Sequence, residues 1–496
     1  MILDPDNWIL KSLLPALLGL GWSVSDADDV AAVEFCLNGQ FDLGVRLQGM
    51  QPRVPERYPT EFCVITANDS NRVHFHAQGK SNPDMSGDWA VSFLPEDVVR
   101  IVNRESPPDI EFSGVSVVNE ALSYRRMDPR RLVAELNANP EWLESEDSSG
   151  AKVAHYPGSR FESTVIVEND QLQSFQTSVD LPLRGRVPVV WNWRWPTDSA
   201  PELRLYIDDE LLFEAEGRFK AVPESEAEAL WQLSGKMEAI AVPGDRWPSQ
   251  VSMQLEEIAA GVYMVHGVRT GFSHLVVETE EGLVVADAPA GWIEIHQIPP
   301  TDLVPGLGIS GLSEKFIEFL AEQFPDKPIR AVAITHAHDD HAGGARAFAA
   351  AGAAIYAPAD AAEFLQTTLN DWNLPEDRFS LQSRRLEVVP VASKVILADP
   401  VNPVELTAVP TNPHVSTALG VWARAVGVFF QSDLHVPDSD QPEPRADRAL
   451  TECWFAQWAV KALPAETIVL NSHSNPATPV SRLAEYLETP ICQEAL

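Results

Sequence analysis

A strand-like apolar run that ends in a cluster of ionisable side chains is the feature that most constrains this chain. Residues 331–344 read AVAITHAHDDHAGG, and the six positions after AVAIT hold three histidines and two aspartates. Imidazole and carboxylate groups are costly to bury unless water, an ion pair or a metal ion compensates. Because α/β proteins place their sites at the carboxyl ends of buried strands, the segment indicates an α/β domain with a polar site at a strand end.

The spacing within this segment predicts two neighbouring binding points. On an extended chain His336 and His338 point the same way, which suits two imidazoles on one ion. Asp340 and His341 follow where the backbone turns into a helix, so we expect them to face a second point nearby. Nitrogen and oxygen ligands of this kind suit two borderline cations, most simply zinc. The two glycines that follow let the backbone pass close to the site.

Further candidate ligands stand after later apolar runs. His414 follows VELTAVP, Asp433 follows VGVFF and His473 follows TIVL. Each is a polar group at the tip of a predicted strand. Together with the first segment, these residues complete two sites that a carboxylate can bridge.

In this order the seven residues resemble the signature of the metallo-β-lactamase fold superfamily, HxHxDH followed by His, Asp and His, over roughly residues 255–490. The resemblance implies an αββα four-layer sandwich with a dinuclear centre. It also implies that DAPAG, at 287–291, places Asp287 behind the site as a support. The implied ligands are His336, His338 and His414 for the first metal, and Asp340, His341 and His473 for the second, with Asp433 bridging.

Two departures from the family pattern qualify the resemblance. The family often has GHTxGH around its third histidine, whereas this chain reads PTNPHVST, so we expect a different loop over the site. Asp433 is present where β-lactamases usually lack a bridging aspartate. This favours the glyoxalase-II, lactonase, sulfatase and phosphodiesterase branches over antibiotic hydrolysis.

The expected activity is that of a zinc-dependent hydrolase with two Zn2+ ions, or alternatively iron or manganese. Two dications lower the pKa of a shared water and polarise a substrate oxygen, so a metal-bound hydroxide attacks a lactone, carboxylic ester or thioester of a small molecule. Asp340 would orient this hydroxide and accept its proton. His435 is a candidate proton donor to the leaving group at the pocket edge. His274 is a weaker candidate for a substrate contact, and His266 and His296 look peripheral.

Several alternatives stay open at this point. A mononuclear iron dioxygenase of the persulfide type shares part of the ligand set, and sulfate-ester or β-lactam hydrolysis is a further possibility. Flavodiiron chemistry is disfavoured, because that branch has a glutamate where this chain has His338. A non-enzymatic alternative is a carrier-like binding module attached to an idle metal domain. The complete ligand set favours the enzyme.

The chain is expected to divide into a β-rich α+β domain at 1–245 and the α/β domain at 246–496. The first region holds strand-like pieces such as RFESTVIVEND and VPVVWNWRW, whereas nine of the twelve histidines follow residue 260. AVPGDRWPSQ, at 241–250, has the prolines and glycine of a linker. The first domain loosely resembles the half-barrel of lipoprotein carriers that large bacterial superfamily members contain.

Local patterns make further predictions about structure. Trp191, Trp193 and Trp195 alternate on one strand face, which indicates packing rather than a ligand groove. His74 and His76 also alternate on a strand, and we interpret them as structural. Residues 313–324 predict a helix with a serine N-cap and one apolar face. Loops at 296–311 and 437–448 are expected to determine the substrate.

Composition excludes some classes of function. The 72 acidic and 36 basic residues give a net charge of −36, which repels phosphate backbones and argues against nucleic-acid binding. No run of 18 apolar residues predicts a membrane span.

Residues 1–22 are interpreted as an amphipathic helix, which favours a cytoplasmic location unless a signal was removed; a periplasmic or secreted location is then the alternative. The oligomeric state, a homodimer included, stays open. The four cysteines are interpreted as buried small hydrophobes.

Overall fold

The computed structural model describes most of the chain. The predicted helix at 1–22, the linker after residue 241, His296 and nearly all of both predicted substrate loops lie outside the described residues. The described residues are 30–42, 49, 57–67, 72–79, 87–94, 98–103, 129–146, 151–155, 163–197, 199–223, 225–226, 236–241, 253–269, 272–290, 309–374, 376–437, 444, 448–473 and 477–496.

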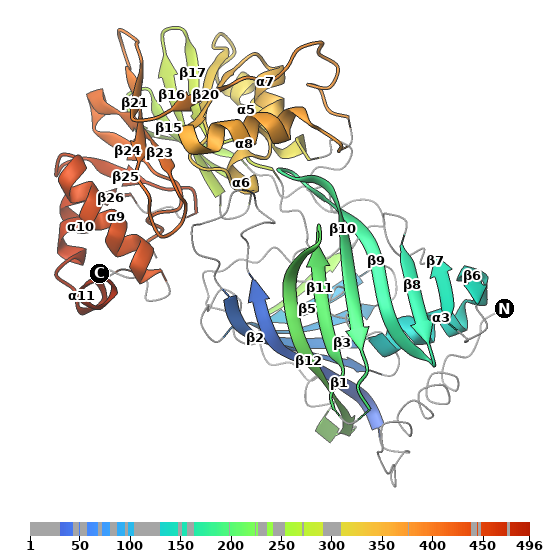
Figure 1. Cartoon of the computed structure of the whole chain (residues 1–496). Coiled ribbons are helices and arrows are strands. Elements are labelled where there is room, and N and C mark those ends of the chain that lie inside the picture. Colours follow the sequence, from blue (N-terminus) through green and yellow to red (C-terminus); the bar gives the residue numbers. More distant parts are fainter. Residues whose placement is uncertain are drawn as a thin grey trace.

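The first region is built on one large antiparallel sheet, which is visibly curved (Figure 1). Two meanders meet where β1 pairs with β12, so the order is β13-β5-β4-β3-β2-β1-β12-β11-β10-β9-β8-β7-β6. The strands are β1 (Val30–Asp42), β2 (Arg57–Ala67), β3 (Arg72–Gly79), β4 (Gly87–Leu94), β5 (Val98–Asn103), β6 (Leu143–Glu146), β7 (Lys152–His155), β8 (Thr164–Glu168), β9 (Gln171–Leu181), β10 (Gly185–Arg194), β11 (Glu202–Ile207), β12 (Glu210–Pro223) and β13 (Lys236–Ala241). The predicted β-rich domain is therefore present.

Alternating residues of these strands bury one face of the sheet. Along β10, Val187 and Val189 are buried while Arg186 and Pro188 are exposed, as the two-residue period of a strand requires. Helix α3 (Pro129–Ala138) buries Leu132, Val133 and Leu136 and is followed by the 3-10 helix η4 (Pro140–Trp142).

The tryptophan stripe belongs to this packing. The Trp193 ring stacks on Trp195 at 6.1 Å between centroids and lies 5.9 Å from Phe35 of β1. Trp191 packs against Phe175 at 5.2 Å. These contacts support the packing interpretation of the three tryptophans. His74 and His76 lie on β3, but their side chains are outside the described set.

The second region contains two mixed sheets. One has the order β14-β15-β16-β17-β18-β19-β20 and the other β21-β22-β23-β24-β25-β26. Their strands are β14 (Gln254–Ala259), β15 (Val262–Arg269), β16 (Phe272–Thr279), β17 (Gly282–Ala286), β18 (Ile329–Ala333), β19 (Ala354–Pro358), β20 (Val388–Val391), β21 (Lys394–Leu397), β22 (Val404–Val409), β23 (Ala418–Ala423), β24 (Val428–Phe430), β25 (Ile468–Leu470) and β26 (Thr478–Pro479).

Three apolar clusters separate four layers, so the predicted αββα sandwich is confirmed. Successive residues of β17 alternate between them: Val284 packs into the cluster between the sheets, and Val285 packs into the cluster beneath the first helical layer. A third cluster joins the six-stranded sheet to the second helical layer. The helices are α5 (Gly311–Gln323), α6 (Asp339–Ala342), α7 (Ala345–Ala350), α8 (Ala359–Asn370), α9 (Ala449–Ala462), α10 (Val480–Tyr486) and α11 (Pro490–Ala495), with the 3-10 helix η5 at Arg424–Val426.

The helix predicted at 313–324 is present as α5, but its predicted cap is wrong. Helix α5 begins at Gly311 with Ser310 at the N-cap, and that side chain makes no capping bond. The Ser313 hydroxyl donates instead to the carbonyl of Pro289 at 2.7 Å. The tertiary contact with the DAPAG turn thus replaces a local cap.

The interpretation of the cysteines as unpaired hydrophobes is wrong, because all four form disulfides. Cys36 and Cys63 lie directly opposite each other on β1 and β2. Cys453 of α9 pairs with Cys492 of α11. These partners are 27 and 39 residues apart in sequence, so only the fold brings them together.

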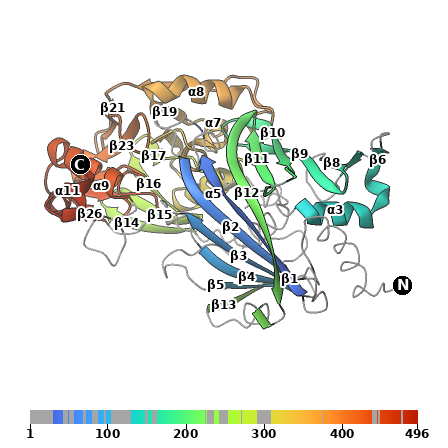
Figure 2. The same cartoon turned by 60° about the horizontal axis from the view of Figure 1, so that its bottom comes forward.

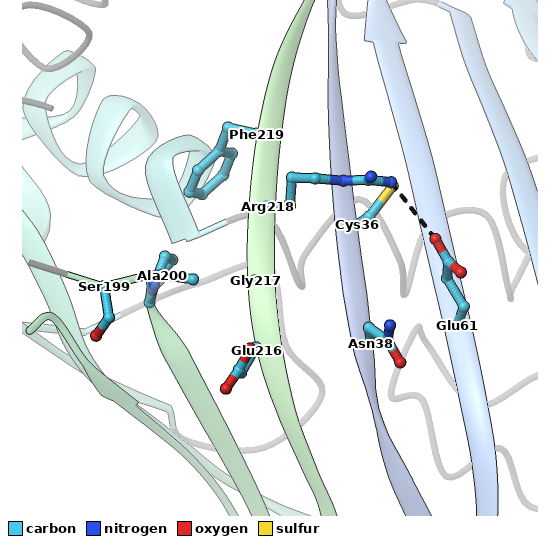
Figure 3. Close-up of a pocket in the computed structure, with 10 residues that line it drawn as sticks. Cys36, Asn38, Glu61, Ser199, Ala200, Glu216, Gly217, Arg218 and Phe219 are labelled. Atoms are coloured by element: carbon cyan, nitrogen blue, oxygen red, sulfur yellow. Dashed lines mark hydrogen bonds and ion pairs between the residues drawn. The ribbon is translucent and has the colours of Figure 1, made fainter. Parts of the chain in front are cut away.

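Cys36, one partner of the first disulfide, lines a cavity of about 560 Å³ in the first region (Figure 3). Arg218 donates from Nη2 to Cys36 Sγ at 3.3 Å and to Glu61 Oε1 at 3.4 Å.

Among the described helices, none is both long and apolar enough to cross a membrane.

Candidate metal centre

The seven predicted ligands come from strand ends of both sheets in the sandwich. His336 lies just beyond β18, and α6 carries Asp340 and His341. Asp433 and His473 follow β24 and β25, which are parallel neighbours in the other sheet. His414 lies in the connection from β22 to β23. The site therefore lies where the two sheets meet.

Backbone hydrogen bonds join the sheets at this place. The Leu419 amide donates to the Thr335 carbonyl at 2.7 Å, and the Ser273 amide donates to the Ser472 carbonyl at 2.8 Å. Both bonds flank ligand-bearing segments. The two halves of the candidate site are thus held in a fixed relation by the main chain.

One donor cluster consists of His336, His338 and His414. His336 Nε2 lies 3.0 Å from His338 Nδ1 and 3.2 Å from His414 Nε2. Three ring nitrogens therefore converge on one point. This is the cluster that the sequence predicted for the first metal.

The second cluster consists of Asp340, His341, Asp433 and His473. His473 Nε2 lies 2.9 Å from Asp433 Oδ1, and His341 Nε2 lies 3.3 Å from both that atom and Asp340 Oδ2. The structure therefore brings the second predicted set together as well.

The carboxylate of Asp433 faces both clusters, one oxygen to each. Oδ2 lies 3.3 Å from His414 Nε2 and 3.7 Å from His336 Nε2. Oδ1 lies near the second cluster, with His473 at 2.9 Å. This is the geometry of a bridging carboxylate.

The protonation states of the first cluster fit a cation. Burial lowers the pKa of His336 well below its ordinary value, with the charges of His341 and His338 acting in the same direction. Burial also lowers the pKa of His338 to about 3. Neutral rings present lone pairs, and converging lone pairs repel unless a cation lies between them.

The second cluster fits a cation for the opposite reason. Burial acts to lower the pKa of His341, but Asp340, Asp433 and Asp287 raise it well above its ordinary value. Oδ1 of Asp340 is buried and without a hydrogen-bond partner. Carboxylates concentrated in a buried place demand positive charge, and a divalent ion supplies it.

Asp287 supports this cluster from behind, in agreement with the sequence-based expectation. Its Oδ1 accepts from the Thr335 amide at 2.7 Å, and its Oδ2 lies 3.0 Å from His341 Nδ1. A carboxylate can only accept, so the proton of His341 resides on Nδ1. With a cation bound in the second cluster, the proton on Nε2 would be displaced and the Nε2 lone pair would be directed at that cation.

Two buried serines that the sequence analysis missed complete the support. The Ser432 hydroxyl lies 2.9 Å from Asp433 Oδ1, 3.1 Å from His341 Nδ1 and 3.0 Å from the Ser472 hydroxyl. Ser472 donates to Asp433 Oδ1 at 3.0 Å. Each serine directly precedes a predicted ligand, but serine at a strand end carries no signal of its own.

The remaining histidine candidates lie elsewhere. His435 is 1% exposed, its Nε2 lies 3.2 Å from the Thr478 hydroxyl and its ring packs against Phe455 and Tyr486. It is not at a pocket edge as expected, because the α9 and α10 layer encloses it. Burial lowers the pKa of His435 to about 3, so it is neutral and carries no proton to donate from an imidazolium.

His274 and His266 also have structural surroundings. His274 is fully buried, and its Nδ1 donates to the Ala286 carbonyl at 3.1 Å. His266 contacts Ser273 and Glu256 at 2.8 and 2.7 Å. Neither ring belongs to a donor cluster, so the substrate contact considered for His274 is not supported.

Residues 266–473 match the family model described as the metallo-beta-lactamase superfamily. The matched segment contains all seven donors. This part of the chain therefore has the metallo-β-lactamase fold and is similar to that superfamily, whose members are generally metal-dependent hydrolases. A comparison with curated proteins finds no match.

Solved structures with this fold include a metallo-beta-lactamase from Pontibacter korlensis, at 18% identity and a TM-score of 0.34, covering 49% of this chain and 99% of that chain. The metallo-beta-lactamase FIM-1 from Pseudomonas aeruginosa in its mono-zinc form has 18% identity and a TM-score of 0.33, covering 50% and 98%. The sec-alkylsulfatase Pisa1 from Pseudomonas sp. has 15% identity and a TM-score of 0.33, covering 48% and 40%.

Proposed function

We propose that this protein is a hydrolase that binds two zinc ions and cleaves an ester-like bond in a small molecule: a lactone, a carboxylic ester or a thioester. The observation that carries the proposal is the Asp433 carboxylate, which presents one oxygen to each of two adjacent donor clusters. A mononuclear site has no use for the second cluster of Asp340, His341 and His473.

Bound zinc ions would supply an activated water and a polarising charge for the substrate oxygen. His336, His338 and His414 would hold the first ion. Asp340, His341 and His473 would hold the second, with Asp433 shared. The chain's own contribution is to fix these donors and to place a proton acceptor beside them.

Asp340 is the residue placed to accept a proton. Its Oδ2 lies near His341, whereas its Oδ1 is buried without a partner. Burial raises the pKa of this carboxyl, but the neighbouring His341 charge outweighs it and holds the pKa below its ordinary value. The group is therefore ionised at neutral pH and has one oxygen free for an incoming proton.

The surroundings restrict the movement of the donors and exclude water from one side. The Phe272 ring packs edge-on against His473 at 4.5 Å, and it is 5% exposed. His341 and Asp287 are fully buried beneath the site. Among the donors, which all lie in the described part of the chain, the His414 and His473 side chains are the more exposed, at 24% and 21%, so a substrate would approach from their side.

The test combines elemental analysis with hydrolysis of a panel of lactones, esters and thioesters. We expect about two zinc ions per chain and hydrolysis that Asp340→Asn reduces at least a hundredfold. Asp339→Asn is the matched control, because Asp339 is the neighbouring buried aspartate and lies outside both clusters.

Other outcomes would overturn the proposal. One iron per chain, with oxygen uptake on thiol substrates and no hydrolysis, would replace it with the dioxygenase. Absence of bound metal even after reconstitution would leave the carrier-like binding module. Equal losses in Asp339→Asn and Asp340→Asn would remove the special role of Asp340.

A further inference from the structure

The β-rich N-terminal domain makes contact with the segment that carries the metal ligands. The end of the β9–β10 hairpin reaches toward α6 (Figure 1), and Figure 2 shows β9 and β10 from another side. This turn, residues 182–184, is called the hairpin tip below. A second contact is the backbone bridge between Gly49 and His338.

Leu183 of the hairpin tip is buried among residues of the other domain. It is fully unexposed and belongs to the apolar cluster that includes Ala337, Ala342 and Ala345. These alanines lie between and directly after the predicted ligands of the HAHDDH segment. Leu183 thus supplies part of the core on which that segment rests.

Glycines make this close approach possible. A Cβ on Gly343 would lie 2.8 Å from the Pro182 Cβ. A Cβ on Gly49 would lie 2.0 Å from the Ala337 carbonyl oxygen and 2.9 Å from Leu183 Cδ1, and its φ of +142° also disfavours other residues. The two domains therefore meet backbone against backbone beside His338.

The hairpin tip is itself rigid. Arg184 pairs with Asp208 at 2.6 Å and with Glu210 at 3.3 Å. Arg186 pairs with Asp180 at 2.7 Å across the base of the turn. A hydrogen bond from the Arg186 amide to Asn373 Oδ1, at 2.9 Å, ties the turn to the second domain.

Helix α6 needs such support on both sides. It has four residues, far fewer than a helix needs for stability of its own. On one side, the amides of Ala288 and Ala290 donate to the carbonyls of His341 and Asp339, at 2.7 and 3.1 Å. The hairpin tip packs near the same segment and supplies the remaining support.

We propose that the N-terminal domain is a working part of the metal centre, in which Leu183 acts as a positioning residue for the HAHDDH ligands. Leu183 has no atom that can bind a metal, and it acts through the alanines of its cluster. The inference rests on the metal binding proposed above. It assigns the first domain a role in setting metal affinity and ligand geometry.

The experiment titrates Co2+ into the metal-free full-length protein, with visible absorption and chelator competition as readouts. We expect Leu183→Ala to weaken Co2+ binding about tenfold, as loss of support around a metal typically does, and to change the visible band. Leu183→Met, which keeps the volume, should restore both. Leu203→Ala is the matched control, because Leu203 is equally buried in the same sheet but lies outside that cluster.

Leu203→Ala should lower thermal stability while leaving the Co2+ affinity and spectrum unchanged. Should Leu183→Ala fail to fold, Asn373→Ala removes only the acceptor for the Arg186 amide from an exposed residue, and should weaken Co2+ binding in the same direction. If whichever of these two variants folds keeps the wild-type Co2+ affinity and spectrum, the role inferred for the N-terminal domain is overturned and the proposed function still stands. A wild-type chain that binds no Co2+ would overturn the proposed function as well.

Discussion

The hydroxyl oxygen of Ser432 lies 2.9 Å from Oδ1 of Asp433, the carboxylate that faces both donor clusters. Ser432 also has a positive φ of 68°, where a side chain is unfavourable. The chain therefore tolerates a strained backbone at a residue whose hydroxyl contacts both Asp433 and His341. We interpret the strain as the cost of holding this hydroxyl in place.

Ser432→Ala should lower zinc affinity about tenfold, because Asp433 Oδ1 loses a hydrogen bond that orients it. Ser432→Gly should show the same loss of zinc affinity. Its free energy of unfolding should nevertheless be about 1 kcal/mol higher than that of the alanine variant, because glycine adopts positive φ freely. Chelator competition and urea unfolding of the metal-free proteins measure the two effects. Ser163→Ala, which removes another buried hydroxyl far from the site, should leave affinity intact. Wild-type affinity in Ser432→Ala would contradict the role of the hydroxyl.

Asp287→Asn should weaken zinc binding between about tenfold and a hundredfold. The amide keeps an oxygen for the Thr335 amide but turns an NH2 group toward His341 Nδ1. The His341 proton then moves to Nε2 and blocks the nitrogen that faces the second cluster. Asparagine also tolerates the φ of 69° at this position.

The readout for Asp287→Asn is a zinc titration with a competing chelator. Asp377→Asn is its control, because Asp377 is a buried aspartate paired with Arg346 outside both clusters. That variant should lose stability and keep zinc affinity. The opposite pattern, with affinity lost at Asp377 and kept at Asp287, is incompatible with the proposed support.

His274 should make stability depend on pH. Burial lowers its pKa to about 4 from the 6.5 of an exposed histidine. Between these values the unfolded chain binds a proton that the folded chain excludes, so stability is complete above about pH 6.5 and is lost as the pH falls toward 4. His274→Asn keeps a donor for Ala286 and has nothing to titrate. Urea unfolding of the metal-free proteins should show the wild type losing about 3 kcal/mol more than the variant between pH 7 and 4. Parallel pH profiles would contradict this assignment.

The Cys453–Cys492 disulfide should stabilise the second helical layer. It closes a loop of 39 residues, for which the entropy of the unfolded chain predicts about 4 kcal/mol. Replacing both cysteines by alanine should therefore lower the free energy of unfolding by that amount, measured with urea under non-reducing conditions. Reducing agent should add a further loss through Cys36–Cys63. Equal stability of the variant and the wild type would show that the packing of α9 and α11 suffices alone.

Disulfides persist mainly in oxidising compartments. We therefore propose the periplasmic or secreted location over the cytoplasmic one. Labelling of free thiols in intact cells, before lysis, tests this. Free thiols at Cys453 and Cys492 in the native protein would contradict it.

Most of the second domain could be predicted from the sequence, because the signals that indicate its strands and ligands are local. The apolar run AVAIT predicted the strand β18, and the HAHDDH segment with three later strand ends predicted both donor clusters. Each of these signals depends on residues close together in the chain or on a motif of fixed order.

The features that could not be predicted from the sequence depend on residues that lie far apart in the chain. Cys36 pairs with Cys63 only through the register of β1 and β2, and Leu183 is buried only because another domain packs on it. The hydroxyl of Ser432 acquires its role from a backbone angle after β24. His435 looked available because it follows Asp433 closely, but helix packing encloses it.

The placement of the donors on both sheets has a mechanical consequence. His336, His338, Asp340 and His341 belong to the seven-stranded side, and Asp433 and His473 belong to the six-stranded side. Under the proposed function, each ion would cross-link the two halves of the sandwich. Chelation should therefore loosen the contact between the sheets first at these strand ends. Amide hydrogen exchange should rise there before it rises in any outer helix.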